Sequence, residues 1–179
     1  DQFGVPYTVL DIAVTSVPSS ISDYALIIIG HKQLDTGHVY FSNSEQNRIV
    51  NAVALGSGLV NFDNDLSTTG LNARYNYVQD LFDFDYVAHQ TGQNVLLSAI
   101  APTHYITNRF VAGQVIGTNP FLSAGIVTPV TATELARIAI LAEPILMVTT
   151  HGSGRAVQWG SYDWMQTSVK GPVREFDNL

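Results

Sequence analysis

The strongest hydrophobic pattern in the chain is the run Ala25–Ile29, which is followed directly by Gly30 and His31. A short, continuous apolar run that is rich in β-branched residues and closed by a glycine is typical of a strand buried on both faces of a parallel sheet. In open parallel sheets, ligands bind just beyond the carboxyl ends of the strands. The pattern therefore predicts a buried strand over residues 25–30, with His31 at the sheet edge where ligands bind.

A helical pattern follows this strand. Ser42 and Glu45 have the spacing of a capping box, in which each side chain accepts a hydrogen bond from the other residue's backbone N–H. Apolar residues then recur at helical spacing, namely Ile49, Val50, Ala52, Val53 and Leu55. Gly56 and Gly58 end the predicted helix, and residues 59–62 begin another strand. Strand, helix and strand in this order predict a βαβ unit with two neighbouring parallel strands.

Shorter apolar runs predict the other elements. Two runs on either side of the glycine-rich turn His151–Gly154 predict an antiparallel hairpin near the carboxyl terminus. Residues 133–142 fit a helix and a strand, and periodicity alone leaves the two open. The remaining predictions are strands at 7–12, 86–90, 95–99 and 111–116 and a short helix at 75–82, with 86–90 and 95–99 joined as a hairpin.

Composition narrows the class of protein. The 179 residues are 46% hydrophobic and 13% charged, which fits one compact domain over residues 1–179. A net charge of −7 argues against nucleic acid or an anionic membrane as the main partner, because such partners need a basic patch. The chain has no cysteine, so disulfides, thiolate metal sites and a cysteine nucleophile are excluded.

The two ends and the polar composition suggest the setting of the domain. Residues 1–7 resemble the end of a helix entering a strand, and residues 177–179 resemble the start of a helix. We therefore expect an interior fragment of a larger protein. Many Ser, Thr and Asn residues with few lysines favour an extracellular or cell-surface location, while the cytoplasm stays open.

Several stretches together resemble the class I glutamine amidotransferase-like superfamily. They are Gly4–Tyr7, Asp23–His31, the helix running into Gly56–Val60, Pro102–Thr107 and His151–Val157. The nearer groups are ThuA-like domains and the amidotransferase-like domains of glycoside hydrolases, including the trimerisation domain of β-galactosidases. The resemblance implies a flavodoxin-like three-layer sandwich with a mostly parallel central sheet, whose first strand would precede Asp1 and whose closing helix would follow Leu179.

The chain lacks the catalytic residues of this superfamily. Active members carry a cysteine at a strand-to-helix turn and a downstream His-x-Glu pair. Here cysteine is absent, His-x-Glu does not occur, and the turn after residues 59–62 reads Asp63-Asn64-Asp65. Glutamine hydrolysis by the superfamily's mechanism is therefore excluded.

Three residues are candidates for another chemistry. His31, Asp63 and Asp65 follow two strands that the βαβ unit places side by side, so they could share a pocket. One imidazole and two carboxylates could bind a divalent cation or act as an acid/base pair. His104 lies in a segment that the resemblance places near the same edge and could join them. The alternative is structural, with His31 at the sheet edge and the aspartates capping a turn.

Other polar and aromatic residues have weaker functional interpretations. Ser57 follows a helix and opens a strand, the reverse of a nucleophile elbow, which predicts a helix-capping turn. His151 opens the predicted hairpin turn, where an exposed, non-catalytic role is expected. The aromatic residues between Arg74 and Val87 either pack against the sheet or stack on sugar rings.

The sequence supports two hypotheses. The first is a non-catalytic amidotransferase-like domain of a larger, carbohydrate-associated protein, serving packing, assembly or ligand binding through neighbouring domains, a second copy or a carbohydrate. The second is a ThuA-like hydrolase or metal-dependent enzyme that uses His31 with Asp63 and Asp65. A divalent cation is the cofactor that only the second hypothesis requires.

Overall fold

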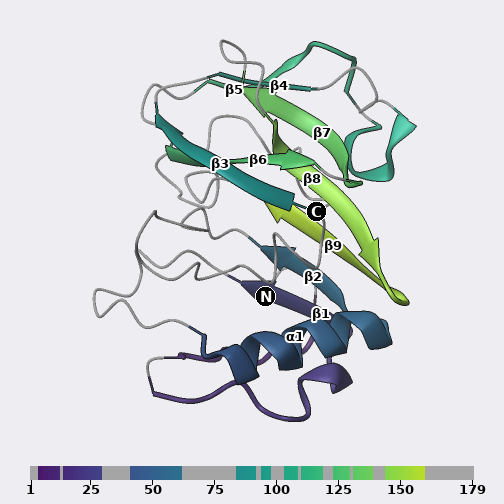
Figure 1. The fold of residues 1–179 in the computed structure, drawn as a ribbon. Coiled ribbons are helices and arrows are strands. Elements are labelled where there is room, and N and C mark those ends of the chain that lie inside the picture. The colour runs from purple at the N-terminus through teal and green to yellow at the C-terminus, as the bar shows by residue number, and fades with distance from the viewer. Residues whose placement is uncertain are drawn as a thin grey trace.

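The computed structural model describes residues 4–12, 14–29, 41–61, 84–91, 94–97, 103–108, 110–118, 123–129, 131–138 and 144–159. Within these ranges, strands form two sheets and one long helix packs on the larger of them (Figure 1). The helix α1 spans Asn43–Leu55, and two short 3-10 helices lie at Ile21–Asp23 (η1) and Tyr105–Thr107 (η4).

The larger sheet has the strand order β1-β2-β9-β8-β7-β4-β5, and β3 pairs with β6 in a separate antiparallel ribbon. The strands are β1 (Leu26–Ile29), β2 (Gly58–Asn61), β3 (Phe84–Thr91), β4 (Asn94–Leu97), β5 (Val115–Thr118), β6 (Ser123–Pro129), β7 (Thr133–Ile138), β8 (Pro144–His151) and β9 (Gly154–Trp159). Strands β1, β2 and β9 run parallel, whereas the pairs from β9 through β5 are antiparallel. The architecture is a partly parallel α/β fold with a mixed sheet.

The predicted βαβ unit is confirmed. β1 and β2 pair in parallel with Leu26 beside Gly58 and Ile29 beside Asn61, and α1 connects them. The helix ends where expected, at Gly56, whose φ of 127° lies in the region that glycine adopts without strain. Gly56 therefore ends α1 and allows the short turn into β2, which begins at Gly58.

The predicted capping box at the start of α1 is also confirmed. The Ser42 side chain accepts from the Glu45 N–H, and the Glu45 carboxylate accepts from the Ser42 N–H at 2.8 Å. The carboxylate also accepts from the Val17 N–H at 3.0 Å, and the Arg48 guanidinium donates to the Val17 carbonyl. Burial raises the pKa of Glu45, but the hydrogen bonds from Ser42 and Val17 and the charge of Arg48 outweigh it and lower the pKa overall. The helix thereby holds the loop before η1 against its first turns.

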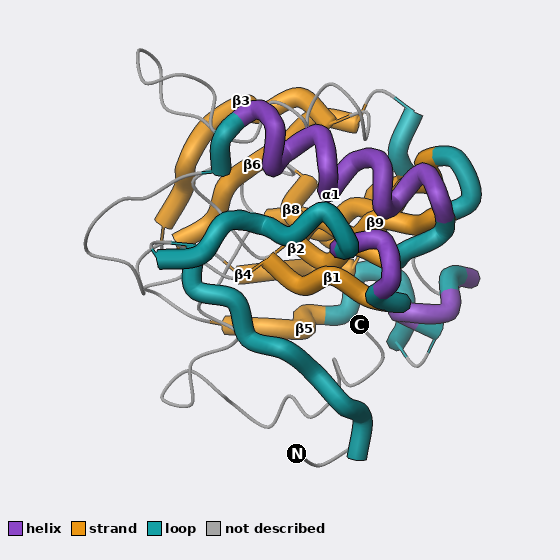
Figure 2. The backbone as a smooth tube through the Cα atoms, turned by 90° about the horizontal axis from the view of Figure 1, so that it is seen from below, coloured by secondary structure: helices purple, strands orange, loops and turns teal. Residues whose placement is uncertain are grey.

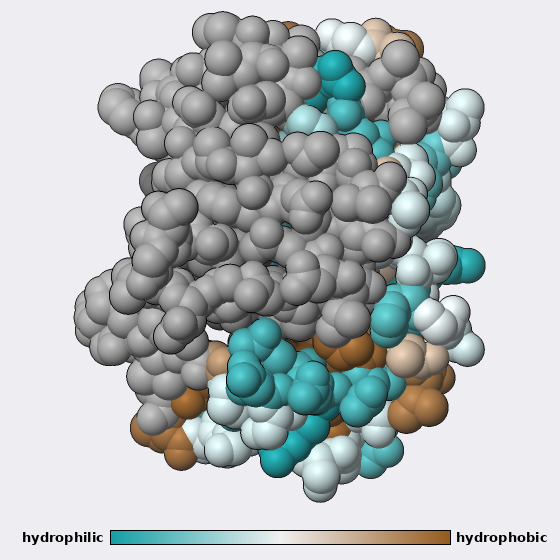
Figure 3. Space-filling model, viewed as in Figure 1, coloured by the Kyte–Doolittle hydropathy of each residue, from teal (hydrophilic) through white to brown (hydrophobic). Residues whose placement is uncertain are grey.

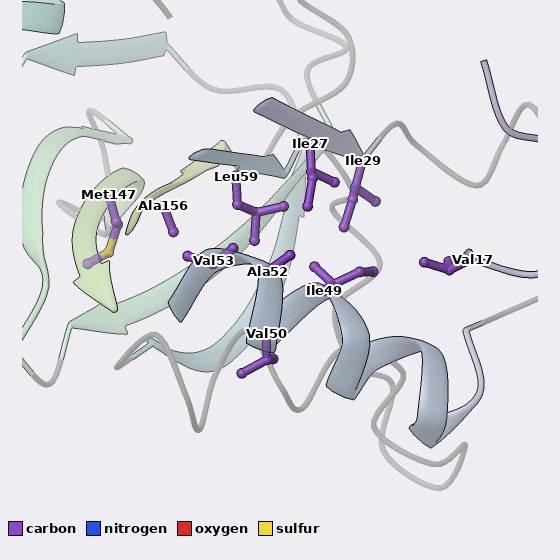
Figure 4. Packing of buried hydrophobic residues seen from close by; sticks show 10 residues of the cluster. All are labelled: Val17, Ile27, Ile29, Ile49, Val50, Ala52, Val53, Leu59, Met147 and Ala156. Carbon is purple, nitrogen blue, oxygen red and sulfur yellow. The ribbon is translucent and has the colours of Figure 1, made fainter. Parts of the chain in front are cut away.

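A single apolar cluster joins α1 to the sheet (Figure 4). Ile27 and Ile29 of β1 and Leu59 of β2 point toward the helix, which lies along one face of these strands (Figure 2). The cluster members are Val17, Ile27, Ile29, Ile49, Val50, Ala52, Val53, Leu59, Met147 and Ala156. Leu55, predicted on the apolar face of the helix, is exposed in the last turn. The solvent-facing side of α1 is mainly hydrophilic (Figure 3).

β1 is not buried on both faces, which corrects the sequence prediction. Leu26 and Ile28 are 49% and 58% exposed, while Ile27 and Ile29 are buried against α1. The reason is position, because β1 is the last strand of the larger sheet and only its helix-facing side is covered. An apolar run alone does not reveal whether a strand is central or at an edge.

The predicted carboxyl-terminal hairpin is confirmed as β8 and β9, and its turn packs on the end of α1. The Ser153 N–H donates to the Ala54 carbonyl at 2.9 Å. Gly152 and Gly154 come so close to the helix that an added Cβ would lie 2.5 Å from the Ala54 oxygen and 2.1 Å from the Val53 oxygen, respectively. Only glycine allows this approach.

Several other sequence expectations were wrong. Residues 7–12 form no strand, and the sheet is not mostly parallel. β3 and β4 do not pair with each other as a hairpin, because β3 pairs with β6 and β4 lies between β5 and β7. The ambiguous segment at 133–142 is a strand over its described part, β7, and the strand expected at 111–116 begins only at Val115. The predicted helix at 75–82 lies outside the described residues.

None of the helices in the described residues has the length and apolar character needed to cross a membrane.

The two-stranded ribbon of β3 and β6 packs near the middle of the larger sheet, because β6 contacts β8.

We predict that Gly154→Ala strongly destabilises the fold. Its Cβ would lie within 2.1 Å of the Val53 oxygen and 2.5 Å of the Ser57 oxygen, both backbone atoms that cannot rotate away. The expected loss in the free energy of unfolding is about 2 kcal/mol or more. Urea unfolding followed by circular dichroism measures it.

Ser153→Ala in the same turn is the matched control, because this side chain is exposed and only its backbone N–H holds the helix. It should change the free energy of unfolding by less than about 0.5 kcal/mol. Equal losses from both substitutions would contradict the packing argument.

Candidate functional site

The candidate site lies at the carboxyl edge of the three parallel strands. β1 ends at Ile29 and β2 at the neighbouring Asn61, so the segments that carry His31 and Asp63 leave the sheet from adjacent points. This is the arrangement that the sequence hypothesis required. His31, Asp63 and Asp65 themselves lie outside the described residues, so their shared pocket stays a prediction.

At this edge, β2 and β9 are joined by a buried amide pair. The Asn61 Nδ2 donates to the Gln158 Oε1 at 2.7 Å, and the two residues are 1% and 0% exposed. They sit side by side in the parallel register. Buried polar groups are retained only where hydrogen bonds satisfy them, so this pair fixes how β2 and β9 meet. Each amide makes further interactions in the structure.

Sequence reasoning did not identify this pair. Asn61 and Gln158 interrupt two apolar strands, Leu59-Val60-Asn61 and Val157-Gln158-Trp159, and an amide inside a predicted buried strand is a signal that could have been noticed. Trp159, next to Gln158, is completely buried. The carboxyl end of β9 is therefore tightly enclosed.

His104, the further candidate for this edge, lies among the described residues. It caps η4, and its Nδ1 accepts from the Ile106 N–H at 3.3 Å, which leaves Nε2 as the donor of the neutral ring. Burial lowers the pKa of His104, and the charge of Arg155 lowers it further. Arg155 is in register with Gly58 at the start of β2, about 10 Å along the strands from Asn61.

Ser57 and His151 are the other polar residues that the sequence analysis considered. The Ser57 hydroxyl is buried and donates to the Tyr24 carbonyl at 2.7 Å, which ties the turn after α1 to the start of β1. This confirms the turn interpretation of Ser57. His151, which was expected to be exposed, is half-buried at the end of β8. In the part of the chain that the structure describes, no three His, Asp or Glu side chains come together as metal ligands would.

Comparisons with known proteins place the fold but not a family. Neither a protein-family model nor a curated protein sequence matches the chain. Among solved structures, the cytoplasmic proteins STM1381 and STM3548 of Salmonella typhimurium match with a TM-score of 0.58, at 20% and 16% identity. The matches cover 83% and 84% of this chain and 65% of each of those chains, so the chain spans about two thirds of their length.

A third similar structure is Gan42B, a GH42 β-galactosidase of G. stearothermophilus. It matches with a TM-score of 0.53 and 19% identity over 78% of this chain, but over only 19% of the galactosidase. The similarity is thus to one part of a larger glycosidase. At these identities the likeness establishes the fold alone, and the names of the Salmonella proteins give no support to an extracellular location.

We predict that the buried amide pair behaves as one unit in stability. Gln158→Met leaves the Asn61 amide without its acceptor and Asn61→Leu leaves the Gln158 oxygen without its donor, so each should cost about 1–3 kcal/mol. The double substitution removes both polar groups and should cost clearly less than the sum. Urea unfolding of all four proteins measures this coupling, and strictly additive losses would contradict it.

The titration of His104 should depend on Arg155. We expect its pKa to lie below the ordinary 6.5 and to rise in Arg155→Gln without reaching 6.5, because burial is the larger cause. Since the folded pKa lies below the unfolded one, stability is complete above pH 6.5 and falls as the pH drops through the folded pKa.

NMR titration of the imidazole protons measures both values. Arg137→Gln is the matched control, because that guanidinium is occupied by Glu134 at 2.6 and 2.8 Å. An unchanged His104 pKa in Arg155→Gln would contradict the assigned electrostatic contact.

Proposed function

We propose that the chain is a non-catalytic, amidotransferase-like domain of a larger, carbohydrate-associated protein, in which it packs against neighbouring parts of the assembly. The observation that carries the proposal is the similarity to a segment that makes up 19% of a GH42 β-galactosidase chain. A fold that occupies a fifth of a glycosidase is suited to a supporting role beside a separate catalytic domain.

The build of the described site supports this role. The carboxyl ends of β2 and β9, where an open α/β sheet would bind a ligand, are occupied by the buried Asn61–Gln158 pair and the enclosed Trp159. The hydrogen bond between the two amides joins β2 to β9. The absence of cysteine from the chain also removes the nucleophile of the amidotransferase reaction.

On this proposal, the finer architecture is the flavodoxin-like three-layer sandwich of the amidotransferase-like superfamily. The parallel order β1-β2-β9 with α1 on one face is the part that supports it. The extracellular or cell-surface setting, which the composition favours, and the contact with carbohydrate belong to the same proposal.

A metal-dependent, ThuA-like enzyme is the second candidate. One observation favours it: β1 and β2 are adjacent and parallel, so His31, Asp63 and Asp65 are in segments that begin from neighbouring strand ends. An imidazole and two carboxylates have the donor set of a site for Mn²⁺ or Zn²⁺. In this alternative His31 is a ligand or a general base, and the aspartates hold the cation.

The two candidates differ in metal binding. We expect calorimetric titration of the chain with Mg²⁺, Mn²⁺ and Zn²⁺ to give no tight, saturable site and the chain to hydrolyse no aryl glycoside or ester. A tight site that is lost in both His31→Ala and Asp63→Asn, with unfolding free energies unchanged, would overturn the non-catalytic proposal. His151→Ala is the matched control, because that histidine lies at the end of β8, far along the chain from the predicted ligands.

A further inference from the structure

The segment of residues 14–23 runs beside α1 and is buried at one residue. Val17 is 2% exposed and belongs to the same apolar cluster as Ile29 and Ile49 (Figure 4), whereas the other residues of the segment are exposed or half-buried. The segment meets the first turns of α1 at Val17, and η1 at its end also contacts the helix. We call residues 14–23 the strap.

The helix holds the backbone of the strap at this same residue. Oε1 of Glu45 accepts from the Val17 N–H at 3.0 Å, and the Arg48 guanidinium donates to the Val17 carbonyl. The other backbone hydrogen bonds of the strap in the described residues are local and stay between Asp11 and Tyr24. Glu45 and Arg48 are therefore the side chains of α1 that hold the strap's backbone.

Both oxygens of the Glu45 carboxylate act as acceptors. Oε2 accepts from the Ser42 N–H at 2.8 Å and from the Ser42 hydroxyl at 2.7 Å, while Oε1 accepts from Val17. An ionised carboxylate only accepts hydrogen bonds, whereas the protonated acid carries an O–H donor. A proton on either oxygen therefore weakens its bond from a backbone N–H, because hydrogen bonds to a charged acceptor are about twice as strong as neutral ones.

The charges around Glu45 favour its ionised form. Burial raises the pKa of Glu45, but the hydrogen bonds from Ser42 and Val17 and the charge of Arg48 outweigh it, so the pKa lies below 4.5. Residues 12–22 carry no charged side chain. The carboxylates on either side of them, Asp11 and Asp23, do not contribute to this shift. The carboxylate is thus ionised, and the strap held, at neutral pH.

We propose that the strap is released by acid: Val17 stays on α1 while Glu45 is ionised and comes away when this carboxylate takes up a proton. Release withdraws Val17 from the apolar cluster and uncovers part of it at the first turns of the helix. The contacts of α1 with β1 and β2 do not involve Glu45, so the sheet and the helix stay together. Because the folded pKa lies below the unfolded one, the attachment is complete above pH 4.5 and is lost as the pH falls through the folded pKa.

Hydrogen exchange of the whole chain, followed by NMR, tests the proposal at the Val17 amide itself. Each measured rate is divided by the intrinsic chemical rate at the same pH to give a protection factor. We expect the protection of Val17 to fall roughly tenfold or more from about pH 6 to about pH 3. The amides of β9, which lies between β2 and β8, should change by less than about twofold.

Glu45→Gln removes the charge at every pH and keeps an acceptor. Glutamine also fits the capping box, so α1 should keep its first turn. We expect the Val17 protection in this variant to be roughly tenfold lower at about pH 6 and no longer to depend on pH. Glu134→Gln is the matched control, because it neutralises another glutamate that is bound to an arginine, Arg137 on β7, and should leave Val17 unchanged.

Three results would overturn the proposal. The first is a loss of protection at Val17 and in β9 at the same pH, because that would be unfolding of the whole domain. The second is a Val17 amide in Glu45→Gln that is as protected as in the unmodified chain. The third is an equal loss in Glu134→Gln, because the effect would then follow from the net charge and not from the bond to Val17.

Discussion

The rest of the structure depends on the contact between the β8–β9 turn and the carboxyl end of α1. The last carbonyls of a helix have no partners within it, and here the Ser153 N–H satisfies that of Ala54. Gly152 and Gly154 permit the contact because any side chain would meet the helix backbone. With the turn held there, β9 must start beside Gly58, which makes it the second parallel neighbour of β2. One turn thus joins an antiparallel hairpin to a βαβ unit in a single sheet.

The βαβ unit could be predicted because its signals are local. Ser42 and Glu45 satisfy each other over three residues, Gly56 ends the helix through its own backbone conformation, and the apolar spacing between them defines the packed face. The hairpin of β8 and β9 was equally predictable, since two apolar runs flank a glycine-rich turn. In each case the residues that determine the element are close to it in sequence.

The remainder depended on partners that are distant in sequence. β3 and β4 have the pattern of a hairpin, yet each pairs with strands that follow later in the chain. The apolar spacing of β7 fits both a helix and a strand, and the segment is a strand because it pairs with β4 and β8. Leu26 and Ile28 look like core residues until the position of β1 in the sheet is known. At the candidate site, the adjacent carboxyl ends of the parallel strands could be predicted from the sequence. The hydrogen bond between Asn61 and Gln158 and the effect of Arg155 on the pKa of His104 could be recognised only in the three-dimensional structure.

The pairing of β2 with β9 has a consequence for how the protein is made. Asn61 and Gln158 are neighbours in space but lie 97 residues apart in sequence. During synthesis, β1, α1 and β2 leave the ribosome long before the strand that completes their sheet. Two short parallel strands and one helix cover little apolar surface by themselves, so their side facing β9 stays uncovered until residues 154–159 have also been synthesised. Closure over such a long loop is slow, and the nascent chain is exposed to aggregation for that whole interval.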